Sequence, residues 1–392
     1  MRVWLAFLVL GLGAAGILTG QGRVPSEYET LYSELSSHLD RFSATIKSGA
    51  SRPLFAAELL PANGNRGEAL LVEQTFPGTV LYLDRLQKMG LQGVTIQMPY
   101  PLLAPGYPRS EEYWKYYRRV AAEVRRRGLK LLAKSGLVFT EKEISPVMPD
   151  YSRVSWDEYL AARSQIAARI AAEIAPDYLT FLNEPSTEAM VLGKPAQPAS
   201  RYRAFVRDTL GRIRTRGGSS RTLLGAGAGT WDNVEFIRTL AATRLDYIDL
   251  HVYPLASRGA DFLERAREMA RIARRARKRV VIGEFWLYKA AARELTGAPV
   301  HVEMFGRDTF GFWSPLDARM FETVAAFASA EGVDYVSAFW SKYFFASLDY
   351  ERLGSYPPGS LLRESDRQAA QNILANVLSD TGRAYQRVAT AR

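Results

Sequence analysis

The segment from residue 247 to residue 285 contains one full repeat of the fold, and it reads YIDLHV at 247–252, DFLERAREMARIARRARK at 261–278 and VVIGEF at 280–285. The two short runs are mostly apolar and are predicted as strands. The segment between them repeats Ala266, Ala270 and Ala273 on one face and carries arginines elsewhere, which predicts an amphipathic helix. Strand, helix and strand in this order predict one unit of a parallel α/β fold.

The same alternation extends over most of the 392 residues. Strands are predicted at 53–60, 93–98, 129–134, 178–183, 222–226, 247–252, 280–285 and 334–340. Helices between them include 110–127, 155–174, 200–216, 261–278 and 316–331. Eight strand-then-helix units predict an α/β fold of the closed (β/α)8 TIM-barrel class. We therefore expect one barrel domain over residues 51–392.

A doubly wound open sheet is the competing architecture, and it usually carries a glycine-rich phosphate turn after its first strand. The glycine-rich stretch of this chain, GAGAG at 225–229, instead follows the fifth predicted strand. It also lacks an acidic partner at the end of the next strand. We interpret it as a tight turn between a strand and its helix, and we expect no organic cofactor.

The N-terminus has the pattern of an export signal. Met1 and Arg2 precede an uncharged apolar run at 3–18, and small and polar residues follow it. Residues 1–22 are therefore predicted to be a signal peptide of an exported protein, secreted or otherwise extracytoplasmic. The alternative is an uncleaved anchor that tethers the protein to a membrane through residues 3–18.

A leading helix is predicted within residues 23–50, ahead of the barrel. Apolar side chains recur there every three or four positions, at Tyr28, Leu31, Leu35, Leu39, Phe42 and Ile46. This spacing places them on one face of a helix.

Composition excludes several kinds of chemistry. The chain is 47% hydrophobic and 23% charged, as expected of a globular protein. It has no cysteine, which excludes disulfides, thiolate metal sites and cysteine nucleophiles. Its three histidines share no helical or strand spacing, so we expect no metal.

The formal net charge of +10 raises the question of a polyanionic partner. The arginines of 125–127, and those of the run 271–279 up to Arg277, fall on predicted helices, which form the outer ring of a barrel, away from its active site. We therefore expect no nucleic acid partner. Attraction to polymers of the cell envelope is the alternative meaning of this charge.

Two carboxylates end apolar strands of the predicted barrel. The fourth strand ends in Asn183 and Glu184, and the seventh ends in Glu284. Active sites of such barrels lie at the carboxyl ends of the strands. Two carboxylates facing each other there supply a proton donor and a nucleophile, which are the groups that cleavage of a glycosidic bond requires.

Two further strand ends agree with this chemistry. Alternation along the sixth strand places Asp249, His251 and Tyr253 on one face, and the eighth strand ends in Trp340. Over residues 53–380 this pattern resembles the clan A retaining glycoside hydrolases, a (β/α)8 superfamily that contains cellulases, mannanases and galactanases.

The resemblance implies a role for each of these residues. Glu184 would be the general acid/base, Glu284 the nucleophile, and Asn183 the partner of the sugar 2-hydroxyl. His251 and Tyr253 would support the site, with Tyr253 hydrogen-bonded to the nucleophile. The aromatic side chains of Trp286 and Trp340 are predicted to stack on sugar rings. The implied activity is double-displacement hydrolysis of a β-linked polysaccharide or oligosaccharide.

Two positions depart from the superfamily pattern. Many relatives carry an arginine on the second strand that supports the nucleophile, and here Gln97 occupies that region. Lys134 ends the third strand, where it could pair with Asp249, contact an acidic sugar or lie on the rim. Because of these departures, an alternative hypothesis stays open, in which the protein is a catalytically silent carbohydrate-binding barrel of the cell envelope. A metal-dependent hydrolase or aldolase is the weaker third hypothesis.

Overall fold

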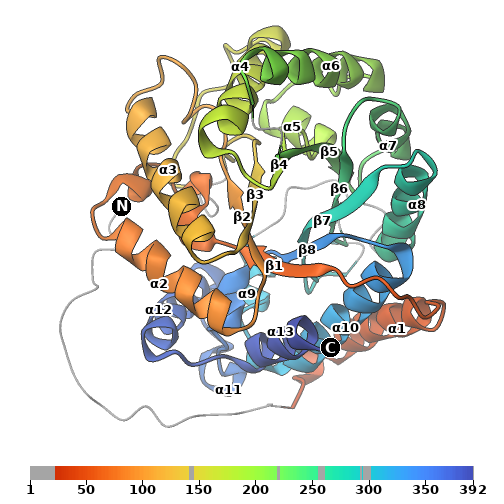
Figure 1. Ribbon diagram of the computed structural model, residues 1–392. Coiled ribbons are helices and arrows are strands. Elements are labelled where there is room, and N and C mark those ends of the chain that lie inside the picture. The colour runs from red at the N-terminus through yellow and green to blue at the C-terminus, as the bar shows by residue number, and fades with distance from the viewer. Residues whose placement is uncertain are drawn as a thin grey trace.

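The computed structural model describes residues 23–140, 145–218, 221–254, 261–291, 294 and 302–391. These residues form a closed barrel of parallel strands in the order β1 to β8 (Figure 1). The strands are β1 (Leu54–Glu58), β2 (Gly93–Gln97), β3 (Lys130–Lys134), β4 (Tyr178–Thr180), β5 (Leu223–Gly229), β6 (Tyr247–Val252), β7 (Arg279–Phe285) and β8 (Tyr335–Ala338). The predicted TIM-barrel class is confirmed.

Helices surround the barrel on all sides (Figure 1). They are α1 (Glu29–Ser43), α2 (Thr75–Lys88), α3 (Ser110–Arg126), α4 (Trp156–Arg169), α5 (Pro185–Val191), α6 (Ala199–Thr215), α7 (Val234–Ala241), α8 (Phe262–Arg275), α9 (Val302–Arg307), α10 (Ser314–Glu331), α11 (Tyr350–Leu353), α12 (Pro358–Ala375) and α13 (Asp380–Thr390). The arginines of α8 at 271, 274 and 275 are exposed on this ring, as its amphipathic pattern predicts.

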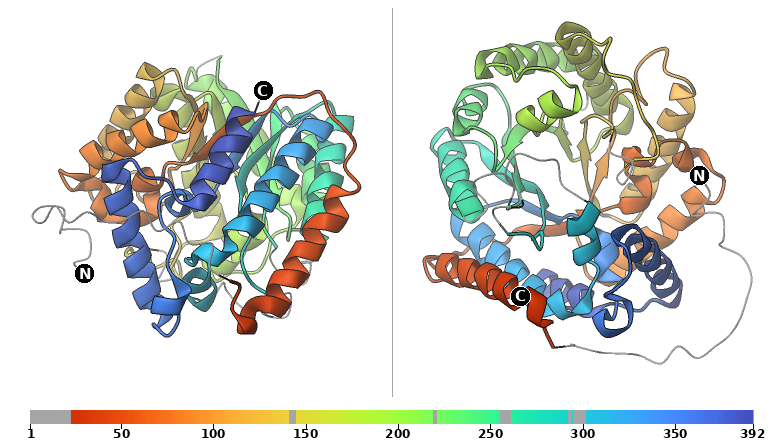
Figure 2. Two further views of the ribbon diagram at one scale, coloured as in Figure 1. Left: turned by 90° about the horizontal axis from the view of Figure 1, so that it is seen from below. Right: turned by 180° about the vertical axis from the view of Figure 1, so that it is seen from behind.

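The predicted leading helix is α1, which lies along α10 on the outside of the barrel (Figure 2). Tyr32 stacks on Trp313 with ring centroids 5.8 Å apart, and Phe42 meets Phe327 at 5.9 Å. The helix is therefore part of the helical ring. The predicted signal or anchor at 1–22 lies outside the described residues. Within the described residues, no helix is long and apolar enough to cross a bilayer.

The GAGAG stretch is not the predicted turn, because it forms the last five of the seven residues of β5. A Cβ atom on Gly227 would lie 1.6 Å from the backbone oxygen of Asp249, and one on Gly225 would lie 2.2 Å from the Tyr247 ring. Only glycine leaves room for β6 at this distance. The glycines therefore serve close packing of two strands, which a local pattern does not reveal.

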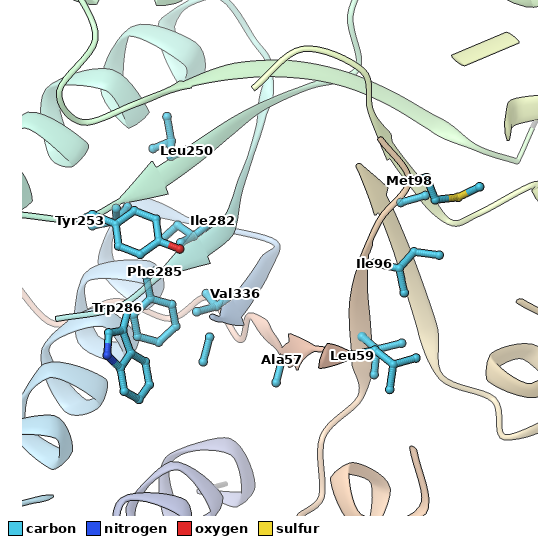
Figure 3. Close-up of a cluster of buried hydrophobic side chains, with 14 of the residues drawn as sticks. Ala57, Leu59, Ile96, Met98, Leu250, Tyr253, Ile282, Phe285, Trp286 and Val336 are labelled. Atoms are coloured by element: carbon cyan, nitrogen blue, oxygen red, sulfur yellow. The ribbon is translucent and has the colours of Figure 1, made fainter. Parts of the chain in front are cut away.

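Side chains inside the barrel form layers that end in a polar site. Tyr178, Tyr247 and Tyr335 pack together at the amino ends of their strands. Above them Thr180 donates a hydrogen bond to Asp249 at 2.8 Å. Apolar side chains of the strands and the helices form the main core, which includes Leu250 and Ile282 (Figure 3). The apolar layers thus leave the carboxyl ends of the strands free for charged groups.

Candidate functional site

The predicted residues meet around one cavity of about 210 Å³ at the carboxyl ends of the strands. Its lining includes five of the predicted site residues, namely Asn183, Glu184, Tyr253, Glu284 and Trp340. His251 lies fully buried below it and contacts Glu184. Strands β4, β6, β7 and β8, or the residues just after them, supply this group, as their places at the ends of the predicted strands indicated.

Glu284 is held by groups from three other strands or their ends. Gln97 donates a hydrogen bond from Nε2 to Glu284 Oε1 at 2.6 Å, and the Tyr253 hydroxyl donates to Oε2 at 2.8 Å. The Lys134 ammonium forms a hydrogen-bonded ion pair with Oε1. These contacts fix the carboxylate in one orientation, which a nucleophile requires.

Glu184 and Glu284 lie close together across the cavity. One carboxylate oxygen of each lies within 4.8 Å of the other and of a His251 ring nitrogen. His251 Nδ1 is 2.5 Å from Glu184 Oε1 and 3.6 Å from Glu284 Oε2. The same imidazole nitrogen therefore lies near both carboxylates.

The pKa values of this group follow from its charges. Burial lowers the pKa of His251, but Glu284 and the hydrogen bonds with Asp249 and Glu184 outweigh it and raise the pKa to about 9. Burial likewise raises the pKa of Glu284, but His251 and Lys134 overcome this effect and hold it below its ordinary value. The charges of the site therefore favour the protonated form of His251 and the ionised form of Glu284.

Lys134 contradicts two of its three predictions, the rim position and the pair with Asp249, while contact with an acidic sugar stays a prediction. It is fully buried, so it is not a rim residue, and its ion pair is with Glu284. Asp249 instead accepts hydrogen bonds from the Thr180 hydroxyl and the Gly283 backbone, each at 2.8 Å. Lys134 thus supplies from β3 the positive charge that Gln97 on β2 lacks.

Glu184, His251 and Glu284 also form a group of side chains that is close enough to hold a metal ion. The Lys134 ammonium lies in direct contact with Glu284 and 3.3 Å from His251 Nε2. A divalent cation would be repelled by this charge. The donor set of this group therefore suits a proton-transfer site better than a metal site.

Trp340 and Trp286, both predicted to bind sugar, have different positions. Trp340 lines the cavity, donates from Nε1 to the Tyr288 hydroxyl at 3.1 Å and has a left-handed backbone conformation with φ of 47°. A strained conformation of a bulky residue is typical of functional sites.

The prediction for Trp286 is wrong, because its ring lies in the core next to Phe285 (Figure 3). Its indole nitrogen donates to Asp308 at 3.1 Å, and the ring stacks on Tyr343. The strand ends at Phe285, so alternation no longer governs where residue 286 points.

Alanine substitutions separate these two roles. We expect Trp340→Ala to weaken substrate binding, seen as a higher KM, with little change in thermal stability. We expect Trp286→Ala to lower the free energy of unfolding by about 3–5 kcal/mol, because it removes a buried ring. Thermal melts and steady-state kinetics of both variants measure this. The reverse pattern would contradict the two assignments.

Several residues of the cavity were not singled out from the sequence. They include Glu58, Asn63, Arg66, Glu188 and Phe305. Glu58 carries a signal that could have been used, because the apolar strand β1 ends in this carboxylate just as β7 ends near Glu284. The others lie on loops and short helices, where no strand alternation fixes their direction.

No protein-family model and no curated protein matches the chain. Among solved structures, a GH5_18 protein from Bifidobacterium longum is 15% identical, with 86% of this chain and 79% of that chain covered and a TM-score of 0.55. A GH5_18 protein from Streptomyces cattleya, in complex with Manβ1-4GlcNAc, is 16% identical, with 87% and 82% covered and a TM-score of 0.54.

The exo-β-1,4-mannosidase Op5Man5 from Opitutaceae bacterium strain TAV5 is 14% identical, with 88% of this chain and 62% of that chain covered and a TM-score of 0.55. At these identities the likenesses show that the chain shares the barrel fold of these proteins.

Proposed function

We propose that the protein is a retaining glycoside hydrolase that cleaves a β-linked oligosaccharide or polysaccharide, with Glu184 as acid/base and Glu284 as nucleophile. The separation of the two carboxylates carries this proposal, since an oxygen of each lies within 4.8 Å of the other. Retaining enzymes hold their carboxyl groups about 5–5.5 Å apart, whereas inverting enzymes leave about 6.5–9.5 Å for a water molecule. Among the solved structures of similar fold, one is named an exo-β-1,4-mannosidase and another holds Manβ1-4GlcNAc, which supports the same activity class.

In the first step the ionised Glu284 attacks the anomeric carbon, and the bond from that carbon to the leaving oxygen breaks. Glu184 gives its proton to the leaving oxygen. Its Oε1 lies 2.5 Å from His251 Nδ1, where it accepts a hydrogen bond from the imidazolium. The acidic proton therefore belongs on Oε2. The product of this step is a glycosyl ester on Glu284 and a free alcohol.

In the second step Glu184, now ionised, takes a proton from water as the water oxygen attacks the anomeric carbon. The ester bond to Glu284 breaks, and both carboxyl groups return to their first state. The imidazolium of His251 and the ammonium of Lys134 stay in place throughout. They stabilise one negative charge as it passes from Glu284 to Glu184, which is how fixed charges lower a barrier.

Lys134 also weakens the hypothesis of a catalytically silent barrel. That hypothesis rested on the missing arginine of the second strand. Because Lys134 supplies a buried positive charge to the same carboxylate, the site has what it needs to keep Glu284 ionised. We therefore favour the enzyme over the silent carbohydrate-binding protein.

The direct test is a screen of the purified protein against β-linked glycans and aryl β-glycosides. Proton NMR of the first product then reports its anomeric configuration. The proposal predicts that the β-anomer forms first and that the α-anomer appears only by mutarotation. An α-anomer as the first product would mean inversion and would remove the proposed mechanism.

Replacement of the acid/base gives a prediction that depends on the leaving group. We expect Glu184→Ala to lose about 10²–10⁴-fold in kcat/KM on substrates with poor leaving groups, which need protonation. It should lose much less on a dinitrophenyl glycoside, and added azide should restore turnover as a glycosyl azide. Equal losses on both substrates, without azide rescue, would show that Glu184 is not the acid.

We also propose export of the protein, with residues 1–22 as signal peptide or anchor. The apolar run at 3–18 supports this proposal. The mass of the chain recovered outside the cytoplasm measures it. A chain that lacks the first residues indicates cleavage, a full-length chain in the membrane fraction indicates an anchor, and a full-length cytoplasmic chain would overturn the proposal.

A further inference from the structure

Glu58, at the end of β1, is a third carboxyl group in the cavity, and the mechanism above does not use it. Its side chain is buried, and Oε1 accepts a hydrogen bond from Asn63 Nδ2 at 2.6 Å. Its backbone is fixed as well, because the Ser341 hydroxyl donates to the Glu58 carbonyl at 2.7 Å. The position of this carboxyl group is therefore well defined before any ligand binds.

The second oxygen of Glu58 is buried and makes no hydrogen bond of normal geometry, although the Trp340 backbone N–H lies near the carboxyl group. Buried polar atoms of proteins are nearly always paired, and an unpaired one costs about 1–3 kcal/mol. Two more buried oxygens without partners, Asn183 Oδ1 and Glu188 Oε2, belong to residues that line the same cavity. A cavity with several unsatisfied oxygens suits a ligand that brings several hydroxyl groups.

The charge state of Glu58 fits the same ligand. Burial raises the pKa of Glu58 to about 7, and the charge of Glu284 adds to the rise, while Asn63 and Lys134 oppose it. Below this pH the group is a neutral acid that can donate from Oε2. Above it the group is an acceptor. A sugar hydroxyl can both donate and accept, so it can pair with Glu58 in either state.

We propose that Glu58 is a specificity-determining residue that hydrogen-bonds one hydroxyl group of the sugar ring bound against Glu284. This inference rests on the proposed glycosidase activity. The consequence is discrimination between sugars at one ring position. A site that pairs with a hydroxyl group rejects the analogue without it strongly, because its own buried group is then left unpaired.

The test combines Glu58→Ala and Glu58→Gln with a set of monodeoxy analogues of the aryl β-glycoside that the wild-type chain cleaves fastest. We expect Glu58→Ala to lower kcat/KM on the parent glycoside by about 10²-fold. We expect Glu58→Gln, which keeps a donor, to lose less. For the deoxy analogue that lacks the hydroxyl group bound by Glu58, the wild-type chain should lose a similar factor in kcat/KM. On that analogue Glu58→Ala should have almost the same kcat/KM as the wild-type chain.

Glu68→Gln is the matched control, because Glu68 is exposed and outside the lining of the cavity. It should keep wild-type kinetics. If Glu58→Ala lowers kcat/KM by the same factor relative to wild type on every deoxy analogue, the inference is overturned, while the proposed enzyme activity is not affected. Faster cleavage of an amino sugar than of the neutral sugar, dependent on Glu58, would overturn it too. Absence of turnover by the wild-type chain on every glycoside would instead overturn the proposed function.

Discussion

Glu284→Gln is expected to lose on the order of 10⁴-fold or more in kcat, because the amide cannot form the glycosyl ester. The substitution preserves size and keeps a hydrogen-bond acceptor for Lys134, Gln97 or Tyr253. Substrate binding should therefore persist, and the KM of any residual activity should change little. Steady-state kinetics together with calorimetric binding of the substrate to the inactive variant measure both parts.

Glu235→Gln, on the exposed start of α7, is the matched control and should keep full activity. A folded Glu284→Gln protein with wild-type turnover would show that another residue attacks the sugar. Unfolding of the variant is measured separately by a thermal melt.

Lys134→Met is expected to cost about 10²–10³-fold in kcat/KM, because it removes a charge that is preorganised beside the nucleophile. The pH dependence of kcat/KM tests this role of Lys134 more specifically than the size of the loss. Lys134 helps to hold the pKa of Glu284 below its ordinary value, so its removal should raise that pKa. The acid limb of kcat/KM should then move to higher pH, and activity should recover partly as pH rises.

The lowered pKa of Glu284 also predicts how the substitution changes the stability of the folded state. A carboxylate with a lowered pKa in the folded state stabilises that state above its unfolded pKa of about 4.3, and this stabilisation is lost as pH falls through the folded pKa. Lys134→Met should therefore be less stable than wild type at neutral pH. Urea titrations of both proteins at several pH values measure this difference.

Lys289→Met provides the comparison, because Lys289 is equally buried and is ion-paired with Asp317, outside the cavity. It should lose stability without a shift in the acid limb. Equal acid limbs in wild type and Lys134→Met would contradict the role assigned to Lys134.

Much of the fold could be predicted from sequence because its periodicities are local. Helix and strand periods identify the βα units, and period two along β6 correctly places Asp249 and His251 on the inner face. Glu284 is identified by a different pattern, an apolar strand that ends in one carboxylate. Once the barrel closes, such strand ends meet at one mouth, so their proximity needs no further information.

The remaining features depend on contacts between distant segments. Lys134 meets Glu284 because β3 and β7 face each other across the closed barrel, and no local pattern states which carboxylate it reaches. The glycines of β5 suggest a turn until the close approach of β6 is known. Trp286 follows a strand end, where the chain leaves the sheet and the ring can turn into the core.

Trapping of the covalent ester tests directly whether Glu284 is the nucleophile. An activated 2-deoxy-2-fluoro-β-glycoside of the cleaved sugar forms the glycosyl enzyme faster than water can hydrolyse it. We predict a mass increase of one fluorosugar per chain, located by peptide mass spectrometry on Glu284, and no adduct on Glu284→Gln. A wild-type chain that cleaves the parent glycoside but carries the label on another residue would contradict the account.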